Sequence, residues 1–331
     1  AHATAPTFNP NNTSKVALVA MRNPSVQDVY EPGSTGKVIT VAAAMEEGLI
    51  TPETVFSIPY SMKVSDGVFR DHEKHPTQRL TTTGLLAVSS NTGSIQIGQK
   101  LGKDNLYKYL TKFGIGQSTN SKLPGESAGI LHPVKDWSGT SLPTISFGQG
   151  YSLTAMQSTS VFATIANNGV RVKPSILAGV VDESGKYTPA AANESTRVLS
   201  EQTAINMRAM MENVVSKNGT APSAAIDGYR VAGKTGTAQR YNTACRCYSG
   251  YTASFIGFAP ADQPKYVVSV TIQDPKGMHW GGVLAGPVFK KVMGFVLQNQ
   301  RISPTPETKT FYSLTEAALK QRSKITPKSG A

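Results

Sequence analysis

The sequence predicts an α+β fold with a helical insertion, because helical patterns occupy the middle of the chain and strand patterns come late. The late part holds three short runs rich in β-branched and aromatic residues and separated by turn residues, which is typical of successive antiparallel strands. These runs are residues 229–237, 251–258 and 266–273. No internal repeat is present, so repeat architectures are not expected.

Segments with apolar periodicity and Gly or Pro punctuation predict the helices. They are residues 38–49, 83–88, 93–101, 103–113, 153–167, 199–215 and 287–297. A further helix is expected over 314–322, inside a Pro-, Lys- and Ser-rich tail that we otherwise expect to be loosely held. Residues 1–21 are rich in Asn, Pro and Thr and are expected to be irregular, and 58–79 are polar and mixed.

Composition indicates a globular chain with a sizeable core. The 331 residues are 39% hydrophobic, and no run approaches the roughly 18 apolar residues of a membrane span. No cleavable signal opens the chain, so any export or anchoring element is expected outside this sequence. The 33 Lys and Arg against 21 Asp and Glu leave a net charge of +12. This charge suits an anionic partner such as nucleic acid, phospholipid or cell-wall polymer, and equally a basic solvated surface.

Two motif-like signals fail on their context. Residues 228–235 match the letters of a phosphate-binding P-loop, but the segment is itself strand-like and poor helix material follows it. Residues 72–75 read His-Glu-Lys-His, which is one residue short of the spacing that puts two His on one helical face. We therefore predict a solvated loop at 72–75, and neither a nucleotide site nor a metal site.

The two cysteines, Cys245 and Cys247, are separated by one residue. A Cys-x-x-Cys redox or zinc pair needs two intervening residues. On a regular strand the two Cα atoms would lie roughly 6.5 Å apart, near the upper limit for a disulfide, and a turn would bring them closer. A local disulfide and two free thiols both stay open.

The segment Ser34-Thr35-Gly36-Lys37 places a serine and a lysine three residues apart at the start of a predicted helix. One helical turn separates them, so the hydroxyl and the amine lie on the same face. The positive end of the helix dipole disfavours a second positive charge there, which helps to keep the lysine neutral and basic. A neutral amine beside a hydroxyl is a Ser-Lys nucleophile pair, although the pattern alone is weak.

Two further segments become informative in combination with the first. Ser89-Ser90-Asn91 puts a hydroxyl and an amide two residues apart, at the break between two predicted helices. In Lys234-Thr235-Gly236-Thr237, on a predicted strand, Lys234 and Gly236 share one face and the two threonines share the other. A fixed cation, hydroxyls and an open backbone edge suit an extended substrate that ends in a carboxylate, and Gly236 lets it approach closely.

The order Ser-x-x-Lys, Ser-x-Asn, Lys-Thr-Gly resembles the motif set of penicillin-binding proteins and serine β-lactamases. Over about residues 5–300 the chain looks like the transpeptidase domain of class B penicillin-binding proteins. The Glu before Pro-Gly-Ser, and residues 251–257, resemble the division-specific branch (septal, penicillin-binding protein 3-like) more than the elongation branch. The segments that carry the resemblance are residues 31–37, 89–93, 147–150, 166–169, 234–238 and 281–289.

The resemblance implies the penicillin-binding protein/serine β-lactamase-like transpeptidase fold, an antiparallel sheet flanked by helices plus an all-helical subdomain. It would fill residues 1–300 and leave 301–331 as a loosely held tail. Family members usually begin with a strand pair upstream of the Asn/Pro-rich stretch, preceded by a pedestal domain and an anchor. We therefore expect a fragment whose sheet lacks its first strands. The Cys-Arg-Cys insertion and the basic tail are not general family features.

The resemblance also implies roles for the site residues. Ser34 is the expected nucleophile, Lys37 its general base, and Ser89 the proton relay to the departing D-Ala amine. Asn91 is expected to orient Lys37 and the substrate amide, and Lys234 to depress the pKa of Lys37 by its charge. The remaining expectations are substrate binding by Ser90, Lys234, Thr235, Gly236 and Thr237, and an oxyanion hole formed by the backbone N–H groups of Ser34 and Thr237. No metal and no cofactor is expected.

The implied activity is a peptidoglycan D,D-transpeptidase that works in septal wall synthesis and is acylated by β-lactams. Expected partners are stem peptides ending in D-Ala-D-Ala, an amine acceptor, and divisome membrane proteins reached through missing regions, but not nucleic acid. The expected location is the extracytoplasmic face of the bacterial membrane. A D,D-carboxypeptidase and a β-lactam-sensing domain stay open. A class A β-lactamase needs a Glu-x-x-Leu-Asn element, which the nearest acidic segment, at Glu126, lacks.

Overall fold

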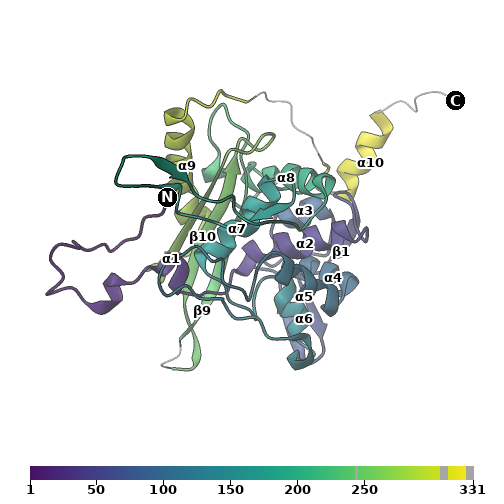
Figure 1. Cartoon of the computed structure of the whole chain (residues 1–331). Coiled ribbons are helices and arrows are strands. Elements are labelled where there is room, and N and C mark those ends of the chain that lie inside the picture. Colours follow the sequence, from purple (N-terminus) through teal and green to yellow (C-terminus); the bar gives the residue numbers. More distant parts are fainter. Residues whose placement is uncertain (243–244, 306–311, 326–331) are drawn as a thin grey trace.

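The computed structural model describes residues 1–242, 245–305 and 312–325 (Figure 1). Its main sheet has three antiparallel strands in the spatial order β11-β10-β9. These strands are β9 (Ala232–Asn242), β10 (Cys247–Ala259) and β11 (Tyr266–Gln273). The three predicted strands are therefore confirmed, and β9 and β10 run on into a long hairpin.

Every helix predicted from the sequence is present in the described chain. The α-helices are α1 (Pro24–Gln27), α2 (Lys37–Glu46), α3 (Thr82–Ala87), α4 (Asn91–Leu101), α5 (Lys103–Lys112), α6 (Ser141–Ser146), α7 (Ala155–Ala166), α8 (Glu201–Val215), α9 (Gly281–Asn299) and α10 (Glu316–Ile325). The 3₁₀ helices are η1 (Leu18–Met21), η2 (Gly33–Gly36), η3 (Val134–Asp136) and η4 (Pro222–Ala224). The start of α9 differs most from the prediction. Proline is common in the first turn of a helix, and the helix was expected to begin at Pro287, but it begins at Gly281 and contains Pro287.

The sheet separates two layers of helices, with α9 on one side and the helical cluster of α2 to α8 on the other (Figure 1). Strand β10 contributes to both cores because successive strand side chains point to opposite faces. Phe255 packs under α9, where its ring lies 4.8 Å from the ring of Phe289. Ile256 and Phe258 face the larger core with the helical cluster.

Helix α2 lies inside this larger core. Its residues from Lys37 to Met45 are all buried. A helix that is apolar on every side is stable only when other elements surround it, and α4, α5 and α8 do so here. The helix that carries Lys37 is thus held by packing on all sides.

Four short strand pairs were not predicted. They are β1 (Val55–Ile58) with β4 (Gln78–Thr81), β2 (Ser61–Val64) with β3 (Gly67–Arg70), β5 (Val170–Val172) with β8 (Ser195–Arg197), and β6 (Gly179–Val181) with β7 (Tyr187–Pro189). Each strand has three or four residues, which is too short for a clear alternation of apolar and polar positions. The β2–β3 hairpin ends at Arg70 and leads into a loop that begins at Asp71, a residue described with the candidate active site.

Part of the C-terminal segment packs back on the domain. The carbonyl of Leu314 accepts from Thr81 N at 3.1 Å, and the carbonyl of Ser313 accepts from Thr81 Oγ1 at 2.6 Å. Ser313 N donates to Glu53 Oε1 at 3.0 Å. The division at residue 300 stays a prediction, and these contacts tie the described residues around 313 to β4 and α3.

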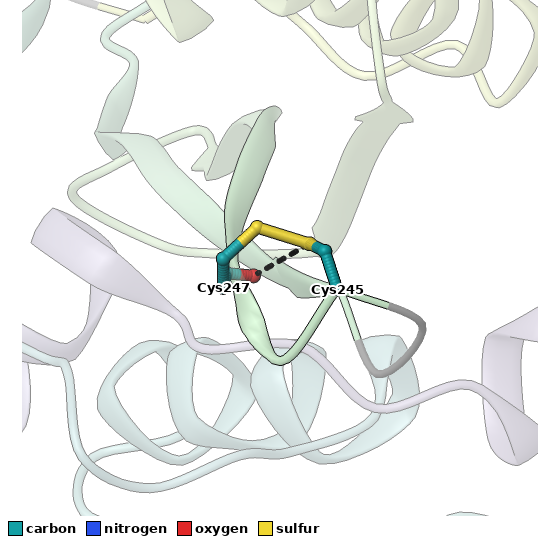
Figure 2. Close-up of a disulfide and its surroundings, with 2 residues drawn as sticks. All are labelled: Cys245 and Cys247. Carbon is teal, nitrogen blue, oxygen red and sulfur yellow. Dashed lines mark hydrogen bonds between the residues drawn. A yellow bond between two sulfur atoms is a disulfide. The ribbon is translucent and has the colours of Figure 1, made fainter.

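The tip of the β9–β10 hairpin carries a disulfide between Cys245 and Cys247 (Figure 2). The two Cα atoms are 5.2 Å apart, closer than on a regular strand, because Arg246 between them adopts a positive φ of 53°. Of the two alternatives left open by the sequence, the structure has the disulfide. In the described parts of the chain, no helix combines the length and the apolar character needed to cross a membrane.

Candidate active site

Ser34 lies in the short helix η2, directly before α2 and one turn before Lys37. Two glycines fix this turn against the loop at residues 147–150. Gly33, with φ of +53°, donates its N–H to the carbonyl of Gly148 at 2.8 Å. A Cβ on Gly148 would lie 1.8 Å from the Gly33 oxygen, so no larger residue fits there. The close backbone contact holds Ser34 half-buried in one place.

The nucleophile turn also packs against β9. A Cβ on Gly236 would lie 3.0 Å from Thr35 Cγ2 and 3.1 Å from the Pro32 oxygen, and a Cβ on Gly33 would lie 3.0 Å from Ala238 Cβ. The absence of a side chain at Gly236 therefore lets the strand approach the turn, and the close approach of substrate at this position stays a prediction. The Ser-x-x-Lys and Lys-Thr-Gly segments are in direct contact.

Ser89 joins these two segments to the third. Its Oγ lies 2.8 Å from Lys234 Nζ and 3.2 Å from Lys37 Nζ, and Lys37 Nζ also donates to the Ser89 carbonyl. Ser89 adopts a positive φ of 62°, a conformation that non-Gly residues hold only when their surroundings impose it. The structure thus brings Lys37, Ser89 and Lys234 together as the sequence predicted.

Both lysines are 0% exposed. Burial lowers the pKa of Lys37 to about 7, and the negative charge of Asp71 opposes this shift. Burial, followed by the charge of Lys37, lowers the pKa of Lys234 well below its usual value. The expected depression of the Lys37 pKa by the Lys234 charge is therefore wrong: burial lowers the pKa of Lys37, and the repulsion between the two lysines lowers the pKa of Lys234. Because two positive charges repel each other across one hydroxyl, the site favours a form with one neutral amine. A neutral amine next to Ser89 Oγ can accept a proton.

Thr235 and Thr237 lie in β9, two residues apart, as the sequence predicted. Thr235 Oγ1 is 3.3 Å from Lys234 Nζ and 2.8 Å from the hydroxyl of Thr220. Thr237 Oγ1 accepts from the N–H of Gly281 at 3.1 Å, at the start of α9. Since Lys234 lies within a strand that continues to Asn242, the P-loop letters form no phosphate loop. Residues 228–231 precede β9 as a turn and an isolated bridge, so only the second half of the segment is a strand, as expected.

Ser90 and Asn91 point elsewhere than expected. Ser90 is 2% exposed, accepts from Gly93 N as the N-cap of α4, and donates to Asp71 Oδ2 at 2.7 Å. The Asn91 side chain donates to the Arg70 carbonyl at 2.9 Å. In the structure these two side chains brace the start of α4, so substrate contact by Ser90 and orientation of Lys37 by Asn91 stay predictions.

Sequence reasoning missed Asp71, and it placed the whole of residues 72–75 in solvent. His72, Glu73 and Lys74 are indeed exposed. The His75 side chain is only 15% exposed, and its Nε2 lies 3.1 Å from Asp71 Oδ2. Asp71 and His75 are four residues apart in the sequence, but the other partners of Asp71 lie 19 to 21 positions further along the chain, which no local pattern indicates. The helix start at Ser90 could have indicated only that an anion would bind there, because unpaired N–H groups and the helix dipole favour one.

Glu126, the acidic residue that was compared with the water-activating Glu of class A β-lactamases, is engaged in local hydrogen bonds. Glu126 accepts hydrogen bonds from the backbone and hydroxyl groups of Thr119 and Ser121. A carboxylate engaged by four donors is poorly placed to activate water, which agrees with the missing Glu-x-x-Leu-Asn element. Within the described residues, no group of three or more His, Cys, Asp or Glu could hold a metal ion.

The family described as "Penicillin binding protein transpeptidase domain" matches residues 1–294. This chain belongs to that family. The transpeptidase domain is 40% identical to penicillin-binding protein PbpB of Mycolicibacterium smegmatis over 312 residues, which cover 91% of this chain and 48% of the relative. It is 36% identical to the peptidoglycan D,D-transpeptidase FtsI of Escherichia coli, over 92% of this chain and 50% of that protein. The chain spans about half the length of these curated relatives.

Solved structures agree with the fold. Penicillin-binding protein 3 from Mycobacterium tuberculosis, complexed with ampicillin, superposes with a TM-score of 0.84 at 36% identity, covering 88% of this chain and 67% of that chain. The transpeptidase domain of penicillin-binding protein 3 from Burkholderia pseudomallei gives a TM-score of 0.77 at 33% identity, covering 86% of this chain and 84% of that one. The predicted fold class and the penicillin-binding protein 3-like branch are confirmed.

Proposed function

We propose that this transpeptidase domain is the catalytic part of a septal peptidoglycan D,D-transpeptidase that works through a Ser34 acyl-enzyme and is acylated by β-lactams. One observation carries the proposal: a single hydroxyl, that of Ser89, lies between two buried lysines beside the turn that holds Ser34. This arrangement supports the assignment of Ser34 as nucleophile, Lys37 as base and Ser89 as proton relay, with both lysines fully buried. The names of the relatives support the same activity.

In acylation, neutral Lys37 accepts the Ser34 proton as Oγ attacks the carbonyl carbon of the penultimate D-Ala. The backbone N–H groups of Ser34 and Thr237 stabilise the oxyanion. When the C–N bond breaks, the proton passes from Lys37 through Ser89 to the departing D-Ala amine. Lys234, with the Thr235 and Thr237 hydroxyls, binds the terminal carboxylate, and Gly236 admits the donor backbone along β9.

In the second half-reaction an acceptor amine attacks the ester carbonyl. Lys37 takes the proton of the amine, the C–O bond to Ser34 breaks, and Ser34 Oγ regains a proton, which restores the free enzyme. The engagement of Glu126 by Thr119 and Ser121 supports a long-lived ester that an amine, and not water, resolves. This feature disfavours a class A β-lactamase, and the acceptor experiment below separates a transpeptidase from a carboxypeptidase.

The proposed substrates are stem peptides that end in D-Ala-D-Ala, and β-lactams compete for the same site. The proposed location is the extracytoplasmic face of the bacterial membrane, with divisome membrane proteins as partners of the longer protein. The net charge of +12 supports a surface that faces an anionic wall polymer.

The first test is the intact mass after incubation with benzylpenicillin. We expect the full mass of the drug on one peptide containing Ser34, none in Ser34→Ala, and unchanged labelling in Ser184→Ala, a control on an exposed turn. Label on another serine would contradict the assignment.

The second test separates transfer from hydrolysis. A donor thioester is mixed with rising concentrations of a D-amino acid acceptor, and both products are quantified. Aminolysis that grows at the expense of hydrolysis supports the transpeptidase. Hydrolysis alone, at a rate indifferent to the acceptor, would make the protein a carboxypeptidase.

A further inference from the structure

We propose that Asp71 and His75 form a positioning pair, which holds the Ser89-Ser90-Asn91 turn in place and sets the charge that acts on Lys37. The inference rests on the proposed function, because Lys37 is its reporter. Neither residue touches the reacting atoms, so both act through the groups that do.

Asp71 binds the segment just after Ser89 with both carboxylate oxygens. Oδ1 accepts the backbone N–H groups of Asn91 at 2.5 Å and Thr92 at 2.9 Å, and Oδ2 accepts the Ser90 hydroxyl at 2.7 Å. These are the first residues of α4, where unpaired N–H groups and the positive end of the helix dipole favour an anion. The side chain of Asp71 is only 8% exposed, so water competes weakly for these bonds.

This anchoring explains how Ser89 keeps its unfavourable backbone conformation. Ser89 has a φ of 62°, which is unfavourable for a residue with a side chain unless its surroundings impose it. On its C-terminal side the chain is tied to Asp71 through Ser90 and Asn91. The Ser89 hydroxyl itself is hydrogen-bonded to Lys37 and Lys234. The carboxylate therefore helps to fix the hydroxyl that relays the proton.

His75 is bound in a geometry that requires both ring nitrogens to donate. Nδ1 lies 2.7 Å from the Pro76 carbonyl oxygen and Nε2 lies 3.1 Å from Asp71 Oδ2. A carbonyl oxygen and an ionised carboxylate are acceptors, and only the imidazolium carries two N–H donors. The same contacts raise the pKa of His75 against the opposing effect of burial. His75 thus places a positive charge against the carboxylate that faces Lys37.

The signs of the two charges on Lys37 are opposite. The Asp71 carboxylate raises the Lys37 pKa, and the imidazolium of His75 offsets that charge, which lowers it. Two further titratable residues lie near these groups: Lys234 Nζ is 2.8 Å from Ser89 Oγ, and the Tyr60 ring meets the His75 ring edge-on at 6.0 Å. Because Lys37 must be neutral to act as a base, the position of the acid limb of acylation reports its pKa.

The test is the rate of acylation by a fluorescent penicillin between pH 5 and 9, in three proteins. Asp71→Asn removes the negative charge, so its acid limb should move to lower pH by about half a unit or more, while the plateau rate falls about 10- to 100-fold through misplacement of Ser89. His75→Gln removes the positive charge, so its acid limb should move to higher pH. A merely structural role would lower the plateau without moving the two limbs in opposite directions.

Matched controls are Asp66→Asn in the exposed β2–β3 turn and His132→Gln in an exposed loop. They make the same side-chain replacements at exposed positions and should leave both the acid limb and the plateau rate of acylation unchanged. His75→Gln alone decides the matter if Asp71→Asn does not fold, because an unmoved or lowered limb overturns the inference. If wild type is acylated and the limbs of both variants stay in place, the pair has no such role. If Ser34 is not acylated in the wild type, the proposed function fails, and this inference with it.

Discussion

The helical side and the sheet side of the active site each contribute one fully buried lysine, and the two lysines are balanced differently. Lys37, at the start of α2, feels the negative charge of Asp71. Lys234, on β9, bonds to the hydroxyl of Ser89 and to oxygens of Thr235. The pKa of Lys234 is lowered by burial and by the charge of Lys37, and no carboxylate in the described parts of the chain opposes that shift. The helical side carries its own counter-charge and the sheet side does not.

This difference in nearby charge explains how two buried lysines can have different roles. An amine whose pKa is near 7 can exchange a proton at neutral pH, which suits a general base. A buried lysine without an anion is costly in its charged form, so an incoming carboxylate would restore its charge. The substrate carboxylate would then provide the negative charge that favours protonated Lys234, as Asp71 does for Lys37.

The largest effect is expected for Lys37→Arg. Arginine keeps the charge and cannot lose its proton, so acylation by benzylpenicillin should slow by about 10²–10⁴-fold. Wild-type acylation should rise as the pH rises through about 7, the pKa of Lys37, because only the neutral amine accepts a proton. Stopped-flow acylation across pH measures both effects, with Lys100→Arg on the exposed end of α4 as a control. A rate within about threefold of wild type would remove Lys37 from the role.

The next effect is expected for Lys234→Gln. Loss of the cation should cost acylation by carboxylate-bearing β-lactams about 3 kcal/mol, or about 100-fold. A β-lactam whose carboxylate is esterified should lose far less, and the melting temperature should change little. Equal losses for the charged and the esterified compound would show that Lys234 does not bind the carboxylate.

The smallest effect is expected at the other end of the same hairpin. Replacing Cys245 and Cys247 together by Ser removes the disulfide at the exposed tip of β9–β10. The ring it closes is short, so the free energy of unfolding should fall by less than about 2 kcal/mol. Acylation should stay within about twofold of wild type. Denaturant unfolding and the acylation rate check the two expectations, and a tenfold slower acylation would mean that the tip acts on the site.

Much of the chemistry could be predicted from local sequence. A serine and a lysine one turn apart on a helix, and a lysine and a glycine on one face of a strand, have relative positions set by the helical and strand periods. The order of the three motifs then identified the family. The same periodicity located the main strands and helices, since each is long enough to show its pattern. The short strands that carry Asp71 toward the site lack that length.

By itself, therefore, the sequence determined which groups are the candidates for the chemistry, because motif spacing and secondary-structure periods are local properties. Only the tertiary structure decided how those groups are charged and held. The pKa of Lys37 depends on burial and on Asp71. The position of the Ser89 hydroxyl depends on lysines from two other elements, and the proposed role of His75 depends on its contact with Asp71, which binds the start of α4. Desolvation and electrostatic interaction act through space, so they depend on which distant segments pack together.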